Sequence, residues 1–250
     1  MPPLRPLDLR LVVALLAVAL LAVALVVRPT VLPQRPCARG RLCVIVHLAR
    51  RPDRLGPARE LRDLLIGWSH RCVVLDATDG STWPSLGVEA FVDLSLREPR
   101  VRSYLNGGEQ GCLESHRRCW AMAREASSAS VVFEDDVTLL PEARGLLEDG
   151  ELEAALALGG GAAVLHLVRT IPNALAGGAT GDKQIARSVH RVGSPNYSSC
   201  AYALDARSAE LLLASRRQLP VDDLMASAEG VRSLAVKPPL VRLLKLGTDT

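Results

Sequence analysis

The chain has 250 residues, of which 48% are hydrophobic, so it can form one sizeable domain with a buried core. Lysine and arginine total 30 against 27 acidic residues, which gives a net charge of +3. Aromatic residues make up only 3% of the sequence. This near balance of charge, with few rings to stack on bases, argues against a nucleic-acid-binding surface.

An uninterrupted apolar run, Leu11 to Val27, follows an N-terminal tail of residues 1–10. At about 1.5 Å per residue in a helix, the run nearly spans a hydrocarbon core of roughly 30 Å. We therefore expect an uncleaved, single-pass membrane anchor. The alternative is a secretory signal peptide, because Ala22 to Ala24 (AVA) has the small-x-small pattern of a cleavage site.

The sequence around the run gives conflicting signals about membrane orientation. Arg5 and Arg10 precede the run, whereas four arginines follow it between Arg28 and Arg41, and this excess places the large domain in the cytosol by the positive-inside rule. Residues 28–41 are rich in proline and read as a stem or linker. Such a stem is typical of membrane-bound enzymes of the secretory pathway. We expect a type II protein with a lumenal domain in the Golgi or endoplasmic reticulum, with a cytosolic domain or a secreted form as alternatives.

The globular domain is expected to occupy residues 42–250, with strands and helices in alternation. The segment Leu42 to Leu48 (LCVIVHL) predicts a buried strand. After it, Asp53 is expected to cap a helix with apolar residues at helical spacing. A second strand, RCVVLD, ends at Asp76. The first part of the domain therefore reads as strand, helix, strand.

The middle of the domain contains an extended helical pattern and an acidic strand. Residues 81–106 show no regular pattern, and Gly107 begins a helical segment that leads into a third strand, SVVFEDD. Farther on, CAYALD predicts a strand and ARSAELLLASRR an amphipathic helix. This alternation indicates an α/β layered fold with a mixed, mainly parallel sheet.

Acidic residues follow two of the predicted strands directly. Asp76 and Asp79 come at the end of the second strand, and Glu134 to Asp136 end the third. In open α/β sheets ligands bind beyond the carboxyl ends of the strands, so these acids lie where a ligand is expected. Adjacent carboxylates repel one another unless a cation offsets their charge, and a hard divalent ion prefers oxygen ligands. Helix capping or simple exposure to solvent is the alternative.

Six segments occur in a recognisable order between Leu42 and Leu240: VIVHLARRPDR, LDATDG, GGEQGCLESHRRCW, VVFEDDV, SSCAYALDARSAELLL and LPVDD. In this order they resemble glycosyltransferase family 25, which includes bacterial lipopolysaccharide galactosyltransferases and animal procollagen galactosyltransferases. The resemblance implies a single-domain nucleotide-diphosphosugar transferase fold of the GT-A-like type. It also implies a UDP-sugar donor, commonly UDP-galactose, a manganese-type ion (Mn²⁺ or Mg²⁺) at the acidic motif, and a glycan or protein hydroxyl as acceptor.

The resemblance and the chemistry together assign roles on the donor side. Glu134 and Asp136 are the expected metal ligands, since an ion that bridges a carboxylate and both phosphates stabilises the leaving diphosphate. Asp135 points to the opposite side if the strand continues, where it can contact the ribose or the sugar. Asp79 and Gly80 match the family's DG pair near the nucleotide.

Two further residues match positions of the family. Arg54 matches an arginine after the first strand and can meet the diphosphate with paired donors, although an exposed arginine at a helix start is the alternative. Ser115 and His116 match the family's SH pair. A histidine on an apolar helix face is as readily a core residue as a catalyst, but this helix leads straight into the acidic strand. We therefore expect His116 to contact the site.

On the acceptor side, the PVDD segment places Asp222 and Asp223 at the start of a short helix. Acids at a helix N-terminus are ordinary caps, and that interpretation stays open. The match to the family's P-V-D makes Asp222 a candidate for the base that an inverting transfer needs on the acceptor hydroxyl. The sequence does not decide between the two aspartates.

Two other functions stay open at this stage. His47 stands where the family usually has asparagine, and Gln110 replaces a hydrophobic residue, so an inactive family member that acts in adhesion or scaffolding is the main alternative. The complete EDD and PVD segments argue against it. A metal-dependent phosphoesterase would also use clustered acids, but it normally needs more histidine ligands than the five histidines scattered along this chain provide.

Overall fold

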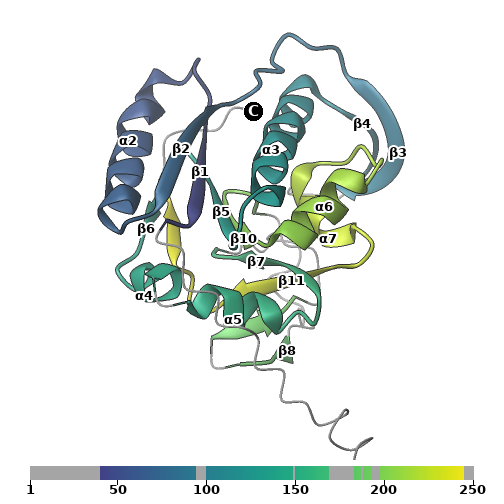
Figure 1. Ribbon diagram of the computed structural model, residues 1–250. Coiled ribbons are helices and arrows are strands. Elements are labelled where there is room, and N and C mark those ends of the chain that lie inside the picture. The colour runs from purple at the N-terminus through teal and green to yellow at the C-terminus, as the bar shows by residue number, and fades with distance from the viewer. Residues whose placement is uncertain are drawn as a thin grey trace, which may run out of the picture. The chain divides into compact units, whose positions relative to one another are not determined.

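An eight-stranded sheet forms the centre of the computed structural model (Figure 1). The structure describes residues 40–93, 100–148, 150–168, 183–186, 188–192 and 198–244. The strands follow the order β2 (Arg71–Asp76), β1 (Leu42–His47), β5 (Ser130–Glu134), β10 (Ala201–Leu204), β7 (Ala162–His166), β11 (Val231–Val236), β9 (Val189–Arg191) and β8 (Lys183–Gln184). All of these run in one direction except β10 and β9, so the predicted mixed, mainly parallel sheet is confirmed.

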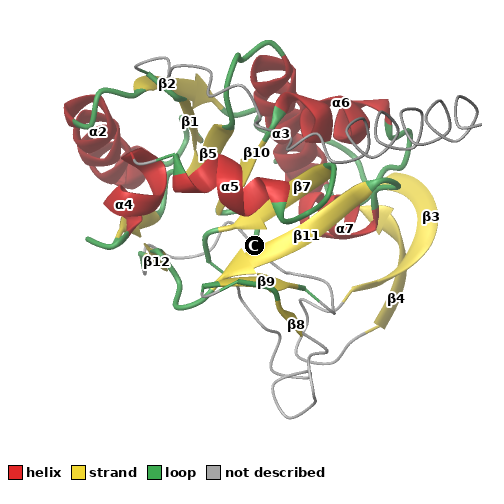
Figure 2. Ribbon diagram, turned by 60° about the horizontal axis from the view of Figure 1, so that its bottom comes forward, coloured by secondary structure: helices red, strands yellow, loops and turns green. Residues whose placement is uncertain are grey.

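Helices cover both faces of this sheet, because successive residues of a strand point to opposite sides. Cys43 and Ile45 of β1 pack in one core cluster with α2 (Pro52–Gly67), α4 (Ala143–Glu148) and α5 (Glu151–Ala157). Val44 and Val46 pack in a second cluster with α3 (Gly107–Arg124), α6 (Ala206–Ala214) and α7 (Val221–Ser227). In Figure 2, α5 crosses in front of β7, with which it packs. The three layers confirm the α/β fold class.

Two small antiparallel pairs accompany the main sheet. β3 (Leu86–Asp93) pairs with β4 (Arg100–Leu105), and β6 (Val137–Leu139) pairs with β12 (Val241–Leu243). The expectation that residues 81–106 lack regular structure is therefore wrong. Within the described side chains of β3 and β4, only Phe91, Arg102 and Leu105 are buried, so these strands show no apolar alternation that the sequence could reveal.

Most of the N-terminal predictions concern residues outside the described part of the chain. This applies to the expected membrane anchor, residues 11–27, and to the expected stem as far as residue 39. Among the described helices, none is long and apolar enough to cross a membrane. Arg41, which we assigned to the stem, is only 8% exposed and pairs with Glu153 at 2.6 Å. The folded domain therefore includes Arg41.

The start of α2 differs from its prediction. The helix begins at Pro52, with Arg51 in the capping position and no side-chain cap. Asp53 lies inside the first turn, where its carboxylate accepts hydrogen bonds from the Arg51 guanidinium. Proline supplies the start signal instead, because its ring fixes a helical φ and it has no N–H that would need a partner.

The loop after β2 rests directly on the first turns of α3, and three glycines make this contact possible. A Cβ on Gly80 would overlap the carbonyl group of Gly107, and a Cβ on Gly107 would overlap the carbonyl of Gly80. A Cβ on Gly111 would lie 2.5 Å from the Thr78 carbonyl oxygen. The Thr78 N–H in turn donates to the Ser115 hydroxyl at 2.8 Å. These contacts hold the loop and the helix together as two walls of one pocket.

This contact gives a prediction for Gly111→Ala. The new methyl group meets main-chain atoms that cannot rotate away, so the variant should lose about 1–3 kcal/mol of unfolding free energy, measured by urea denaturation. The control is Gly67→Ala at the end of α2, where no atom lies within 4 Å of the added Cβ. It should be neutral or up to about 1 kcal/mol more stable. Equal stability of the two variants would contradict the close contact.

Candidate functional site

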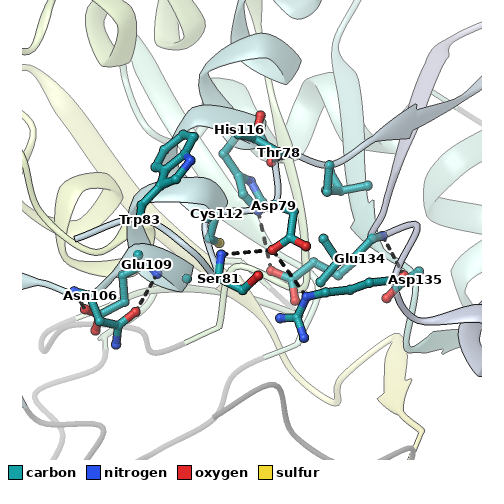
Figure 3. Close-up of a pocket in the computed structure, with 18 of the residues that line it drawn as sticks. Thr78, Asp79, Ser81, Trp83, Asn106, Glu109, Cys112, His116, Glu134 and Asp135 are labelled. Carbon is teal, nitrogen blue, oxygen red and sulfur yellow. Dashed lines mark hydrogen bonds and ion pairs between the residues drawn. The ribbon is translucent and has the colours of Figure 1, made fainter. Parts of the chain in front are cut away.

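The carboxyl ends of β1, β2 and β5 open onto a pocket of about 800 Å³ that also reaches the first turn of α3 (Figure 3). This is the edge of the sheet at which the sequence predicted a ligand. Six predicted site residues line it: Arg54, Asp79, Gly80, His116, Glu134 and Asp135. Asp136, Asp222 and Asp223 lie outside the lining, although the charge of Glu134 acts on both Asp136 and Asp222.

Asp135 is almost completely buried, and protein donors occupy both of its carboxylate oxygens. Oδ2 lies 2.8 Å from Nδ1 of His47 and accepts a hydrogen bond from the Leu48 N–H at 3.1 Å. Oδ1 accepts from Nη1 of Arg54 at 3.2 Å. The strand ends at Glu134, so the alternation on which we based a sugar contact does not extend to Asp135. Its carboxylate instead fixes β1 and α2 relative to the acidic motif.

Arg54 lies between two aspartates of that motif. Its Nη1 is 3.2 Å from Asp135 and 3.3 Å from Oδ2 of Asp136. The residue is 6% exposed, so the alternative of an exposed arginine at the helix start is wrong. Arg54 also lines the pocket, which places a cationic group beside the acids and within the space open to a ligand.

Glu134 is kept ionised by its neighbours. The Ser199 hydroxyl donates to its Oε1 at 2.7 Å, and Nε2 of His116 lies 3.4 Å from the same oxygen. Burial alone would raise the pKa of Glu134, but His116, Ser199 and the charge of Arg54 outweigh it and hold that pKa below its usual value. Glu134 therefore carries a negative charge at the inner wall of the pocket.

His116 connects this carboxylate to the core. Its ring is fully buried, and Nδ1 lies 2.8 Å from the Tyr202 hydroxyl. The indole N–H of Trp120 donates to the same hydroxyl at 2.8 Å. Because indole can only donate, the Tyr202 oxygen accepts from Trp120. His116 is therefore a core residue that also contacts the site, since one ring nitrogen is satisfied in the core and the other faces Glu134.

Two further carboxylates near Glu134 each have one oxygen without a partner. Oδ1 of Asp136 and Oδ1 of Asp222 are inaccessible to solvent and have no hydrogen-bond partner. Burial and repulsion by Glu134 raise the pKa of Asp136 to about 6. Burial, Glu134 and Asp223 raise the pKa of Asp222 well above its usual value. An uncompensated buried carboxylate oxygen is the kind of ligand that a divalent cation satisfies, so the residues fit a metal at the acidic motif.

Asp222 and Asp223 both lie in the first turn of α7, as predicted, but in different surroundings. The Ser199 hydroxyl donates to Glu134, and the same side chain also acts to lower the pKa of Asp222, so Asp222 lies near the end of β5. Asp223 offers its main-chain carbonyl to the Ser227 hydroxyl at 2.6 Å. The charge of Glu134 acts on Asp222, which therefore lies near the acidic motif.

Asp79 and Gly80 lie at the mouth of the pocket. Oδ1 of Asp79 accepts from the Ser81 N–H at 2.9 Å and lies 3.3 Å from Nε of Arg50. Gly80 is explained by its main-chain contact with α3, which leaves no room for a side chain. The DG pair therefore shapes the turn that carries Ser81 and the half-exposed ring of Trp83 to the pocket.

The sequence interpretation missed four residues of this site: Cys112, Ser199, Tyr202 and Trp83. Cys112 precedes His116 by one helical turn, and that spacing was a usable signal for a shared face. Ser199 lies in the loop before β10, and Tyr202 lies in β10 itself. Both come close to β5 because β10 pairs with β5 as an antiparallel neighbour. No local pattern indicates that pairing. Trp83 belongs to a stretch that we expected to be irregular.

A family model described as "Glycosyltransferase family 25 (LPS biosynthesis protein)" matches residues 45–225. The matched range contains every predicted site residue, together with β2, β5 and the second half of β1, whose carboxyl ends frame the pocket. The chain is therefore a glycosyltransferase and belongs to glycosyltransferase family 25. No curated protein matches it in sequence.

The environment of Asp136 gives a pH-dependent prediction. Its folded pKa of about 6 exceeds the ordinary value of 3.8, so its contribution to stability is full at low pH and is lost as pH rises through about 6. Asp136→Asn does not titrate there. Without metal, the variant should gain on the order of 1 kcal/mol relative to the wild type between about pH 4 and pH 7.5, after discounting for partial exposure.

Urea denaturation in a chelating buffer at both pH values measures this difference. The wild type at about pH 4 serves as the internal reference, because Asp136 is then protonated in the folded chain and only about half ionised in the unfolded chain. If the stability advantage of Asp136→Asn over the wild type shrinks as pH rises, pairing of Asp136 with Arg54 outweighs its repulsion by Glu134.

Proposed function

We propose that the chain transfers a hexose, namely galactose, from a UDP-sugar to a hydroxyl of a glycan or protein acceptor. The proposed reaction uses Mn²⁺ or Mg²⁺ and inverts the configuration at the anomeric carbon. The supporting observation is the pair of unsatisfied oxygens, Oδ1 of Asp136 and Oδ1 of Asp222, both on carboxylates that the charge of Glu134 acts on. One belongs to the turn after β5 and the other to α7. The reaction needs two such carboxylates, one to hold a cation and one to accept a proton.

Glu134 and Asp136 are the residues that would hold the ion. Bound there, it would act as a Lewis acid that offsets the charge developing on the leaving diphosphate. The neighbouring Arg54 contributes a second cationic group from the wall of the pocket. Its guanidinium can exchange Asp136 for a phosphate oxygen, because planar paired donors suit both groups.

The opposite side of the pocket suits a nucleotide. The ring of Trp83 is 41% exposed and lines the pocket, so a base can stack on it. Gly107 and Gly108 form the first turn of α3 and also line the pocket. Their main-chain N–H groups carry the positive end of an 18-residue helix, to which a diphosphate is attracted. A volume of about 800 Å³ lies within the range of pockets for ligands of this size.

Asp222 is the proposed base. Its raised pKa moves its proton affinity toward neutral pH, where a general base is most effective. Ser199, which donates to Glu134, also lies close enough to Asp222 to lower its pKa, so Asp222 is near the donor side. In an inverting transfer the acceptor hydroxyl attacks opposite the leaving diphosphate, and the carboxylate takes its proton.

A donor panel tests the proposed reaction. The full-length chain is incubated with UDP-galactose, UDP-glucose and UDP-N-acetylglucosamine in Mn²⁺, with and without glycan acceptors, and released UDP is measured. We expect fastest release from UDP-galactose and none after chelation. Asp136→Asn should bind UDP in Mn²⁺ only as tightly as the metal-free wild type does. Absence of release from every donor, or unchanged UDP affinity in the variant, would refute the proposal.

The role of Asp222 is tested by separating binding from turnover. Asp222→Asn should keep UDP-galactose affinity within a few-fold, while turnover falls by about 10² or more, the usual scale for loss of a general base. Asp223→Asn, its neighbour in α7, should keep most of its turnover. If donor affinity collapses in Asp222→Asn and turnover falls only in proportion, Asp222 belongs to the donor or metal shell.

A further inference from the structure

Three metal-ligating side chains meet in the pocket wall, and one of them is Glu134, which the oxygen-ligand ion proposed above also uses. Cys112 and His116 lie one turn apart on α3, and both face Glu134 at the end of β5 (Figure 3). The Cys112 sulfur, a His116 ring nitrogen and a Glu134 oxygen all lie within 4.8 Å of one another. Within the described residues, this is the one group of three such side chains that meets this spacing.

We propose that Cys112 Sγ, His116 Nε2 and the Glu134 carboxylate form a site for a thiophilic divalent cation of the Zn²⁺ class. This site is separate in chemistry from the oxygen-ligand ion proposed above. Thiolate and imidazole select zinc-like ions, whereas Mn²⁺ and Mg²⁺ prefer oxygen. Three protein ligands leave a fourth position open to the pocket, as in zinc sites that accept water or a substrate.

The ligand atoms of Cys112, His116 and Glu134 are slightly farther apart than in a metal-bound site, and small side-chain rotations would bring them together. Tetrahedral zinc bonds of about 2.0–2.3 Å place ligand atoms roughly 3.3–3.8 Å apart. Nε2 of His116 and Oε1 of Glu134 are already 3.4 Å apart. The remaining closure falls on Cys112, whose side chain can turn toward the other two ligands by rotation about one bond.

His116 is prepared for such a role. Its Nε2 is buried and has no hydrogen-bond partner, while Nδ1 is held by the Tyr202 hydroxyl at 2.8 Å. A metal-binding histidine usually directs its other ring nitrogen to a polar partner that fixes the ring, and the Trp120–Tyr202 pair supplies one. When the ion binds, the Cys112 thiol releases its proton to solvent and the thiolate forms the metal–sulfur bond. Binding of the ion does not rest on the proposed transferase reaction.

Cobalt(II) is a direct probe of this site, because a thiolate ligand gives it a sulfur-to-metal charge-transfer band in the near ultraviolet. Titration of the full-length, reduced chain with Co²⁺ should give a saturable band at one ion per chain. Zn²⁺ should displace it, and excess Mg²⁺ should not. Absence of the band in the wild type would overturn the proposal.

Matched cysteine variants locate the ligand. Cys112→Ser should abolish the band and weaken Zn²⁺ binding at least tenfold, with thermal melting used to confirm that it is folded. The control is Cys200→Ser, because Cys200 is also buried and close enough for Glu134 to influence it. It should keep both the band and the affinity. A band that survives in Cys112→Ser, or one lost in Cys200→Ser alone, would show that the sulfur ligand lies elsewhere.

His116→Gln gives a second test that does not depend on sulfur. It should keep the Cys112 thiol while weakening Zn²⁺ binding at least tenfold, because one of three ligands is lost. If the variant does not fold, Tyr202→Phe replaces it: this variant removes only the hydroxyl that holds Nδ1, and a 10–100-fold loss of Zn²⁺ affinity is then expected. Unchanged Zn²⁺ affinity in folded His116→Gln, or in Tyr202→Phe where that variant replaces it, would contradict a role for His116 as a ligand.

Discussion

The negative charge of Glu134 is the constraint on which the rest of the pocket depends. Burial at the end of β5 opposes that charge, and the side chains of His116 and Ser199 compensate for it from α3 and from the loop before β10. Once Glu134 is ionised, each neighbouring carboxylate meets a field that disfavours further negative charge. The raised pKa values of Asp136 and Asp222 both include this repulsion. The pocket therefore has a high affinity for positive charge built into its inner wall.

Asp135 shows that the surrounding frame, not the residue type, decides how a carboxylate behaves. It is adjacent in sequence to both Glu134 and Asp136, yet donors from His47, Leu48 and Arg54 satisfy its two oxygens. These donors belong to β1, the loop after it and α2, so Asp135 joins the sheet to the first helix. Its role is to support the site, while its two neighbours remain available to a ligand.

Hydrophobic periodicity and chain order were enough to predict four strands of the sheet (β1, β2, β5 and β10), the long helix α3, the start of α7 and the acids at the carboxyl edge. They were not enough to separate the roles of Glu134, Asp135 and Asp136, because the strand ends at Glu134 and alternation no longer applies beyond it. The burial of Arg54 also depends on long-range contacts, since its partners lie 81 residues or more along the chain. Ser199 and Tyr202 reach the site through an antiparallel strand pairing that no local pattern encodes.

Glu134 belongs to both of the cation sites proposed above, the oxygen-ligand site with Asp136 and the site with Cys112 and His116. His116 and Ser199 both contact Oε1 of Glu134, so an ion held by Asp136 and Glu134 would have to use the other oxygen to leave these contacts in place. A thiophilic ion on Cys112 and His116 instead has to insert at Oε1, in place of the contact that now offsets the charge. An N and S ligand set binds zinc more tightly than it binds manganese, so affinity alone favours the soft ion there. Under these two proposals, metal availability would decide which ion binds, and a bound diphosphate would favour the oxygen-preferring ion by contributing its own oxygens.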